Sequence, residues 1–181
     1  MLDVAVAYDR YRFVGHEFLT WLWFMIELHP DRLPTPNRKN GGLDLGNRMV
    51  LENRHGDRCE TITIKGDDAG LEEGLLALKK GALVTEINLV YRSGELQWQF
   101  TLKGESLNLS SVKTPESPRP ENRNELEGFV LDKIGLYEKV IAFIENIFKS
   151  FIQLRVSDQW DRTLVPQIKA WIADPRSPSG Q

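Results

Sequence analysis

The chain has 181 residues, of which 41% are hydrophobic and 27% charged, and its formal net charge at pH 7 is −3. This composition predicts a globular protein with one main core, and it excludes a surface that is basic everywhere, though not a local basic strip. The single cysteine, Cys59, excludes an internal disulfide bond and fits a reducing cytoplasm.

Near the N-terminus, two features bear on location. Leu2–Ala7 is a short apolar segment, either an edge strand or the end of a connection to something upstream, and it lacks the basic region of a secretory signal. The apolar run Phe18–Leu28 is about half the roughly 20 residues that a membrane-spanning helix needs. The sequence therefore predicts a cytoplasmic protein without a membrane segment.

The most apolar stretch, GHEFLTWLWFMIEL at Gly15–Leu28, predicts a central helix. At helical spacing its apolar residues form stripes on both sides, and a helix that is apolar all round is normally buried. It is expected to lie in the core or under a partner chain. The residues assigned to this core or interface are Phe18, Trp21, Trp23 and Phe24.

A first hairpin is predicted after a loop over Asp31–Gly42. Arg48–Arg54 and Cys59–Lys65 are strand candidates, and the turn signal His55-Gly56-Asp57 separates them. Alternation in the second of these strands predicts one buried and one solvated face.

Next comes a predicted helix and a second hairpin. Ala69–Lys80 begins with acidic residues, ends with lysines and is followed by Gly81, all of which favour a capped helix. Ala82–Arg92 and Glu95–Lys103 then alternate apolar and polar residues, the pattern of an antiparallel pair that covers a core. Leu107–Val112 is a candidate third strand.

The C-terminal third divides at a Pro-rich segment. The predicted divisions are an α+β core over residues 1–112, a linker over 113–125, a C-terminal helical region over 126–174 and a disordered tail over 175–181. Pro166 is expected to interrupt the last helix. The fold class is α+β: an antiparallel sheet built from two hairpins, covered by helices, with a long C-terminal helical region.

Motifs for chemistry are weak. His55 and Cys59 flank a turn with no third group in view, so a surface histidine and a half-buried cysteine are the expected interpretation. The acidic residues around Asp67-Asp68 are explained by the start of a helix rather than by a cation site. The sequence shows no phosphate-binding glycine loop and no zinc spacing, and we expect no catalytic residue, no metal and no cofactor.

Basic residues cluster in the first hairpin and in the loop before it. Each alone is usually a solvated surface charge, but as a set they are able to line one edge and contact phosphates. Such contacts give salt-dependent affinity without sequence recognition. The candidate nucleic-acid-binding residues are Arg32, Arg38, Lys39, Arg48, Arg54 and Arg58.

Three stretches resemble the recombination-associated RdgC family. GHEFLTWLWF at Gly15–Phe24 is similar to a signature of its shorter or divergent members, and LKKGALVTEINLVYRSGELQWQFTL at Leu78–Leu102 is similar to its helix and two strands. The Leu-, Ile- and Phe-rich region Leu126–Leu154 resembles its long C-terminal helical part. The resemblance implies a non-catalytic homodimer that binds duplex DNA through phosphates, with little sequence preference, in recombination.

Two alternatives remain open at this point. The apolar helices also fit a protein–protein assembly module of oligomeric type that binds no nucleic acid, since they suit an oligomer interface as well as a monomer core. An enzyme whose site is assembled from scattered polar residues is the third hypothesis, and a pocket that joins several ionisable groups would favour it.

Overall fold

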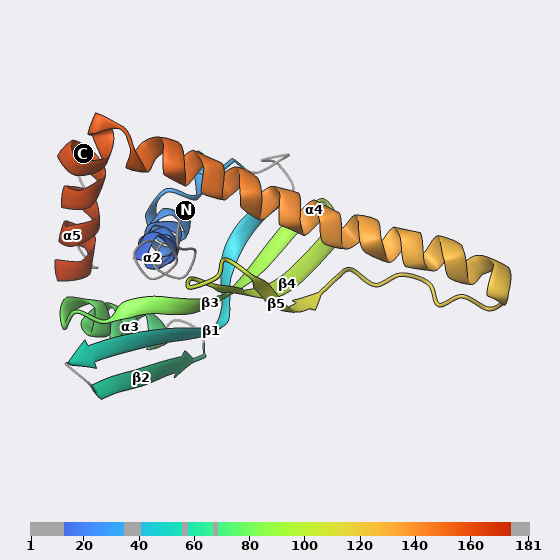
Figure 1. The fold of residues 1–181 in the computed structure, drawn as a ribbon, viewed down its shortest axis with the longest axis horizontal. Helices are drawn as coiled ribbons and strands as arrows, with labels where there is room; N and C mark the ends of the chain where they lie inside the picture. Colours follow the sequence, from blue (N-terminus) through green and yellow to red (C-terminus); the bar gives the residue numbers. More distant parts are fainter. Residues whose placement is uncertain (1–12, 35–40, 56–57, 67–68, 175–181) are drawn as a thin grey trace, which may run out of the picture.

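The computed structural model describes residues 13–34, 41–55, 58–66 and 69–174. As the sequence predicts, the fold is α+β, with an antiparallel sheet and helices against one of its faces (Figure 1). In chain order the elements are α2 (Phe13–Leu28), a 3₁₀ turn (Pro30–Arg32), β1 (Gly41–His55), β2 (Arg58–Lys65), α3 (Ala69–Lys79), β3 (Leu83–Ser93), β4 (Leu96–Lys103), β5 (Leu109–Lys113), α4 (Arg123–Arg155), a π-helical turn (Trp160–Leu164) and α5 (Val165–Ala173).

The five strands lie in the order β2-β1-β3-β4-β5, and every neighbouring pair is antiparallel. Both predicted hairpins are present, and β1 pairs with β3 to join them into one sheet. β1 begins at Gly41, so the strand predicted over Arg48–Arg54 was too short, and the predicted loop over Asp31–Gly42 overlaps β1 at its last two residues. Its register with β3 shifts between Leu45 and Met49, an irregularity that bends the strand.

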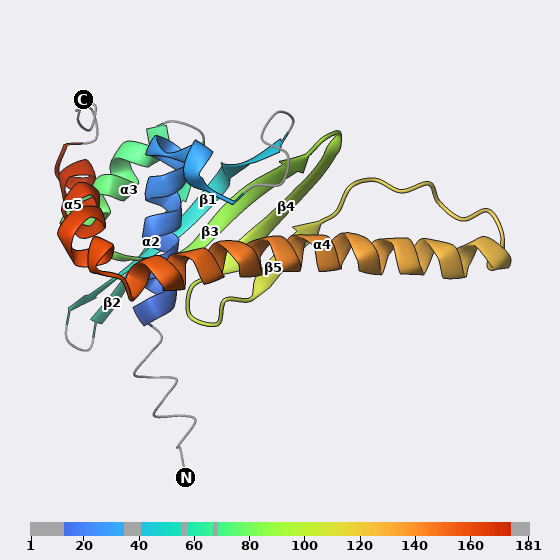
Figure 2. The same cartoon turned by 90° about the horizontal axis from the view of Figure 1, so that it is seen from above.

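The core is organised around α2, which lies between the sheet on one side and α4 and α5 on the other (Figures 1 and 2). Its predicted core residues, Phe18, Trp21, Trp23 and Phe24, are all buried. The ring of Phe18 lies 5.2 Å from that of Phe151 in α4. The ring of Trp23 meets that of Trp171 in α5 edge-on at 5.2 Å, so residues from both ends of the chain close the core.

The first turn of α2 is fixed against the sheet by two close approaches. The backbone of Gly15 touches that of Gly104, which follows β4, and a Cβ on Gly15 would collide with the Gly104 carbonyl oxygen. Next to it, the buried His16 ring donates from Nδ1 to the backbone oxygen of Val84 at 2.9 Å. This hydrogen bond occupies the edge of β3 at the point where β4 has ended.

We predict that Gly15→Ala destabilises the protein by about 3 kcal/mol, because the added methyl group forces α2 away from a backbone that cannot yield. Gly128→Ala is the matched control, since Gly128 is an exposed α4 residue with open space around its Cβ position. That substitution should stabilise α4 by about 0.5–1 kcal/mol. Urea denaturation measures both, and equal stability of Gly15→Ala and wild type would contradict the close contact.

At the C-terminal end of α2, burial and then the charge of Arg32 lower the pKa of His29 from its usual 6.5. The unfolded chain therefore takes up a proton before the folded protein does, and stability falls as the pH decreases below about 6.5. We predict that wild type loses more stability than His29→Gln between pH 7.5 and pH 5.5. Urea denaturation at the two pH values measures this difference, and identical losses would contradict it.

Between β5 and α4, residues 114–122 form an extended segment that we call the strap. It is the middle part of the linker predicted over 113–125, because Lys113 belongs to β5 and residues 123–125 belong to α4. The strap is attached to α4, since the Lys133 ammonium donates to Thr114 Oγ1 and to the Pro115 oxygen, both at 3.0 Å. At its far end the backbone N–H of Glu125 donates to Asn122 Oδ1 at 3.1 Å, which caps the start of α4.

The rest of the C-terminal region follows the sequence closely. α4 is one uninterrupted helix of 33 residues. The interruption predicted at Pro166 takes the form of a π-helical turn, Trp160–Leu164, after which Pro166 lies in the first turn of α5. Leu2–Ala7 and the tail over 175–181 lie outside the described residues. Among the helices that are described, none is long and apolar enough to cross a membrane.

Candidate functional site

The most distinctive surface is on the N-terminal half of α4, which extends past the sheet with the strap beside it (Figures 1 and 2). We call this half of α4, residues 123–141, the arm. Its inner side is held in place by the strap and by the sheet: Lys133 clamps the strap, and the indole Nε1 of Trp98 in β4 donates to the Leu136 oxygen at 2.9 Å. The Lys133 ammonium also lies 5.7 Å from the centre of the Phe129 ring.

On a second side of the arm, a stripe of apolar side chains faces solvent. These residues recur at spacings of three and four, so they share one face of the helix, with one further apolar residue beside them. Their exposed fractions range from 42% to 61%, which is high for side chains of this type. The stripe consists of Leu126, Val130, Ile134, Tyr137 and Ile141, and the residue beside it is Leu131.

Acidic residues border this stripe along one flank. Glu127 and Glu138 are both exposed, and their helical positions place them on the same side of the apolar row. The exposed Asp132 lies on a different side of α4, away from the stripe. The arm thus presents an apolar row with a negative border.

The open face of the sheet, opposite the helices, is polar and mixed in charge. The Glu86 carboxylate lies 2.9 Å from Arg48 Nη1 and 3.7 Å from Lys103 Nζ, and it binds both cations. Cations outnumber carboxylates among the described strand side chains of this face. The cations are Arg48, Lys65, Arg92, Lys103 and Lys113, and the carboxylates are Asp44, Glu52 and Glu86.

The structure does not bring the described members of the predicted basic set together. Arg48 lies on the open face and is paired with Glu86, whereas Arg58 is the first residue of β2, where its backbone register partner is His55 at the end of β1. Seven residues of β1 separate these two positions, roughly 23 Å. Arg32 lies in the 3₁₀ turn before β1 and is exposed. Arg38, Lys39 and the side chain of Arg54 lie outside the described residues.

A polar cleft of about 330 Å³ lies at the corner where β3 extends beyond β4. It joins several ionisable side chains, the kind of arrangement that an enzymatic interpretation requires. Within the described chain, however, the only hydrogen bond of the His16 ring is to Val84, and Glu86 is engaged by two cations. These contacts leave neither His16 nor Glu86 as a base that is hydrogen-bonded to a nucleophile in the described chain. Its ionisable residues are His16, Arg48, Glu52, Glu86, Lys103 and Glu105.

The remaining candidates for chemistry are the metal-ligating side chains and Cys59. Within the part of the chain that the structure describes, no group of three or more His, Cys, Asp and Glu side chains is placed to hold a metal ion. Cys59 was expected to be half-buried, but it is exposed, with its Sγ 3.6 Å from Glu52 Oε2. The side chain of His55 lies outside the described set, so the His55/Cys59 pair is described only on its cysteine side.

Sequence reasoning missed the exposed stripe of the arm. Its residues recur at the same helical spacing as the buried row of α4, and no local sequence feature shows where the sheet stops covering the helix.

The comparison with known proteins found no match: no protein-family model, curated protein or solved structure matches this chain.

Proposed function

We propose that this chain is a protein-assembly module that pairs with a second copy of itself through the arm. The observation that carries the proposal is the row of half-exposed apolar side chains on a helix that extends beyond the domain core. Apolar patches of this kind on a monomer usually mark a protein-interaction surface. The arm is also attached on its inner side, so its outer side is presented in one conformation.

The stripe is complementary to itself when two copies run antiparallel. A two-fold axis near Ile134 places this residue beside its counterpart, and it sets the small Val130 against the large Tyr137. The same axis sets Leu126 against Ile141. Such a contact is isologous, because each copy contributes the same patch. It closes into a dimer and leaves no free end.

The expected dimer is weak. The paired helices span Arg123–Ile141, roughly 28 Å, so the contact falls toward the small end of stable protein interfaces. An antiparallel arrangement also brings Glu127 of one copy near Glu138 of the other, which is repulsive. The proposal therefore predicts a dissociation constant of about 1–10 μM rather than an obligate dimer.

We predict that Ile134→Glu abolishes dimerisation, since it puts two carboxylates at the centre of the apolar contact. Sedimentation equilibrium over a micromolar concentration range measures the mass. The charge control is Asp132→Lys, which alters the arm away from the stripe and should leave the dissociation constant unchanged. A wild-type protein that stays monomeric at 200 μM would contradict the proposal.

The antiparallel geometry has a test of its own. Glu138→Lys converts two repulsive contacts with Glu127 into attractive ones and should tighten the dimer by about fivefold to tenfold. In a parallel pair the same substitution would face the opposite flank, near Lys133, and would weaken the dimer. Raised salt should tighten the wild-type dimer and loosen that of Glu138→Lys.

The second candidate function is the one that the family resemblance implies, non-specific binding of duplex DNA in recombination. The observation that favours it is the excess of cations on the open face of the sheet, where Lys65 and Lys113 form no ion pair within the described chain. Those two lysines are the side chains that we propose to contact phosphates.

For this candidate, the double variant Lys65→Glu/Lys113→Glu should weaken binding to a 30-base-pair duplex at least tenfold at about 50 mM salt. The control is Lys149→Glu/Lys169→Glu, which makes the same charge change on the helices and should bind like wild type. A gel-shift titration measures both. No binding of the wild-type protein at this salt concentration, or equal losses in the two double variants, would exclude the phosphate contacts.

A further inference from the structure

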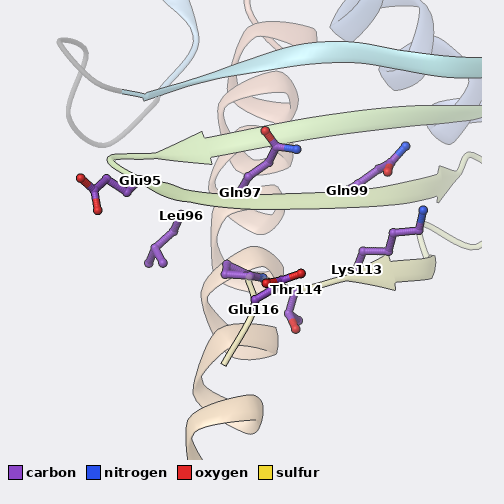
Figure 3. A pocket seen from close by; sticks show the side chains of 8 residues that line it. Glu95, Leu96, Gln97, Gln99, Lys113, Thr114 and Glu116 are labelled. Atoms are coloured by element: carbon purple, nitrogen blue, oxygen red, sulfur yellow. The ribbon is translucent and has the colours of Figure 1, made fainter. Parts of the chain in front are cut away.

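One edge of the sheet is only partly covered. β5 pairs with β4 at Gln99, Thr101 and Leu102, and no described strand lies beside Leu96–Trp98 on that side. Figure 3 shows this stretch of β4 open along its outer edge, with the strap turning away from it after Lys113. A cleft of about 510 Å³ occupies the space between them.

The backbone groups of Gln97 point into this cleft. In an antiparallel sheet, alternate residues of a strand direct their N–H and C=O groups to opposite neighbours. The N–H of Lys103 donates toward β5, to the Asn108 oxygen at 3.0 Å, and the Thr101 oxygen accepts from Ser110 Oγ on the same side. Continuing in steps of two, the N–H and C=O of Gln97 also face outward, where no strand pairs with them in the described chain.

The opposite wall of the cleft is held in place by α4. Thr114 and Pro115 form that wall, and both are hydrogen-bonded to the Lys133 ammonium, so the strap is kept away from the edge of β4. Pro115 is also buried. The opening is therefore a fixed feature of the arm's attachment, with an unpaired strand edge on one side and an anchored segment on the other.

The side chains around the cleft define what fits it. Leu96 is 38% exposed and also borders an apolar hollow of about 610 Å³ on the helix side of β4, next to Phe143. At the rim, Glu95 and Glu116 form no hydrogen bond or ion pair within the described residues, and their carboxylates flank the opening (Figure 3). Lys113 lines the other end of the cleft, beside Gln99. An incoming strand would thus meet an apolar surface on one face, carboxylates near the hairpin end of β4 and a cation at the far end.

We propose that this cleft binds a short extended peptide of a partner protein, which adds to β4 as an extra strand. The peptide exchanges backbone hydrogen bonds with Gln97, places an apolar side chain over Leu96 and sets a lysine or arginine near Glu95 and Glu116. The open edge from Glu95 to Trp98 is roughly 13 Å long, which matches about four peptide residues. This site is separate from the stripe of the arm.

The probe is a phage-displayed library of random dodecapeptides, selected on the immobilised full-length chain. Selected sequences are synthesised with a fluorescein label and titrated by fluorescence polarisation. Peptides that carry a basic residue next to an apolar one are expected, with binding that weakens at least tenfold in Gln97→Pro. Proline removes the outward N–H without breaking a bond to β3, so the sheet should still form.

Gln97→Ala is the matched control, because it removes the same side chain but keeps the backbone N–H, and it should bind like wild type. The double variant Glu95→Lys/Glu116→Lys should weaken basic peptides by a similar factor. Urea denaturation verifies that each variant is folded. Failure to select any peptide, or peptides that bind Gln97→Pro as well as wild type, would overturn the proposal. Loss of peptide binding in Ile134→Glu, the variant that blocks dimerisation, would also overturn it, because the peptide would then occupy the arm.

Discussion

The contact between α2 and the sheet is the constraint on which the remaining structure depends. Phe18, Leu22, Trp23 and Phe24 are fully buried, so this helix must be covered on nearly every side. The sheet covers one side, and the C-terminal half of α4 and α5 cover the others. Because the first turn of α2 rests directly on the backbone of Gly104, the helix has one available position.

That position determines where α4 extends. The C-terminal end of α4 is fixed against α2, partly by the Arg155–Glu17 ion pair at 2.6 Å, in which the hydrogen bond to Glu17 raises the pKa of Arg155. A helix of 33 residues is roughly 50 Å long, which is more than α2 and the sheet cover. Its N-terminal half must therefore extend beyond the core. The arm is a consequence of this mismatch in length, and no described residue covers the apolar row on it.

Local patterns predicted most of the elements. Alternation in Leu96–Lys103 marks β4, and the charge placement with Gly81 marks α3, since both signals depend only on neighbouring residues. The pairing of β1 with β3 was not predictable in this way, because residues such as Leu45 and Leu89 are distant in sequence. The start of β1 was missed for the same reason: its first residues become a strand through contact with β3.

The candidate surfaces were harder to predict than the fold. Helical periodicity shows that Val130 and Ile134 share a face, but it does not show where the sheet ends and leaves them exposed. The basic residues show the opposite problem. Arg48 and Arg58 are close in sequence, yet β1 and β2 carry them to different places, and Glu86 neutralises the first. Closeness in sequence does not give a converged patch when the intervening chain is extended.

The strap connects the two proposed protein-binding surfaces. One ammonium group, that of Lys133, fixes the wall of the β4 cleft and lies on the inner side of the same helix whose outer side carries Ile134. The two surfaces are built from different residues: β4 and the strap line the cleft, whereas Leu126–Ile141 carry the stripe. Any coupling between the two surfaces must pass through the strap and α4. It would be equal in both directions, since ligands that bind at linked sites change each other's affinity by the same factor. If Lys133 holds the strap in the same position in both states, that factor is one, and the arm allows a dimer to display two peptide sites that act independently.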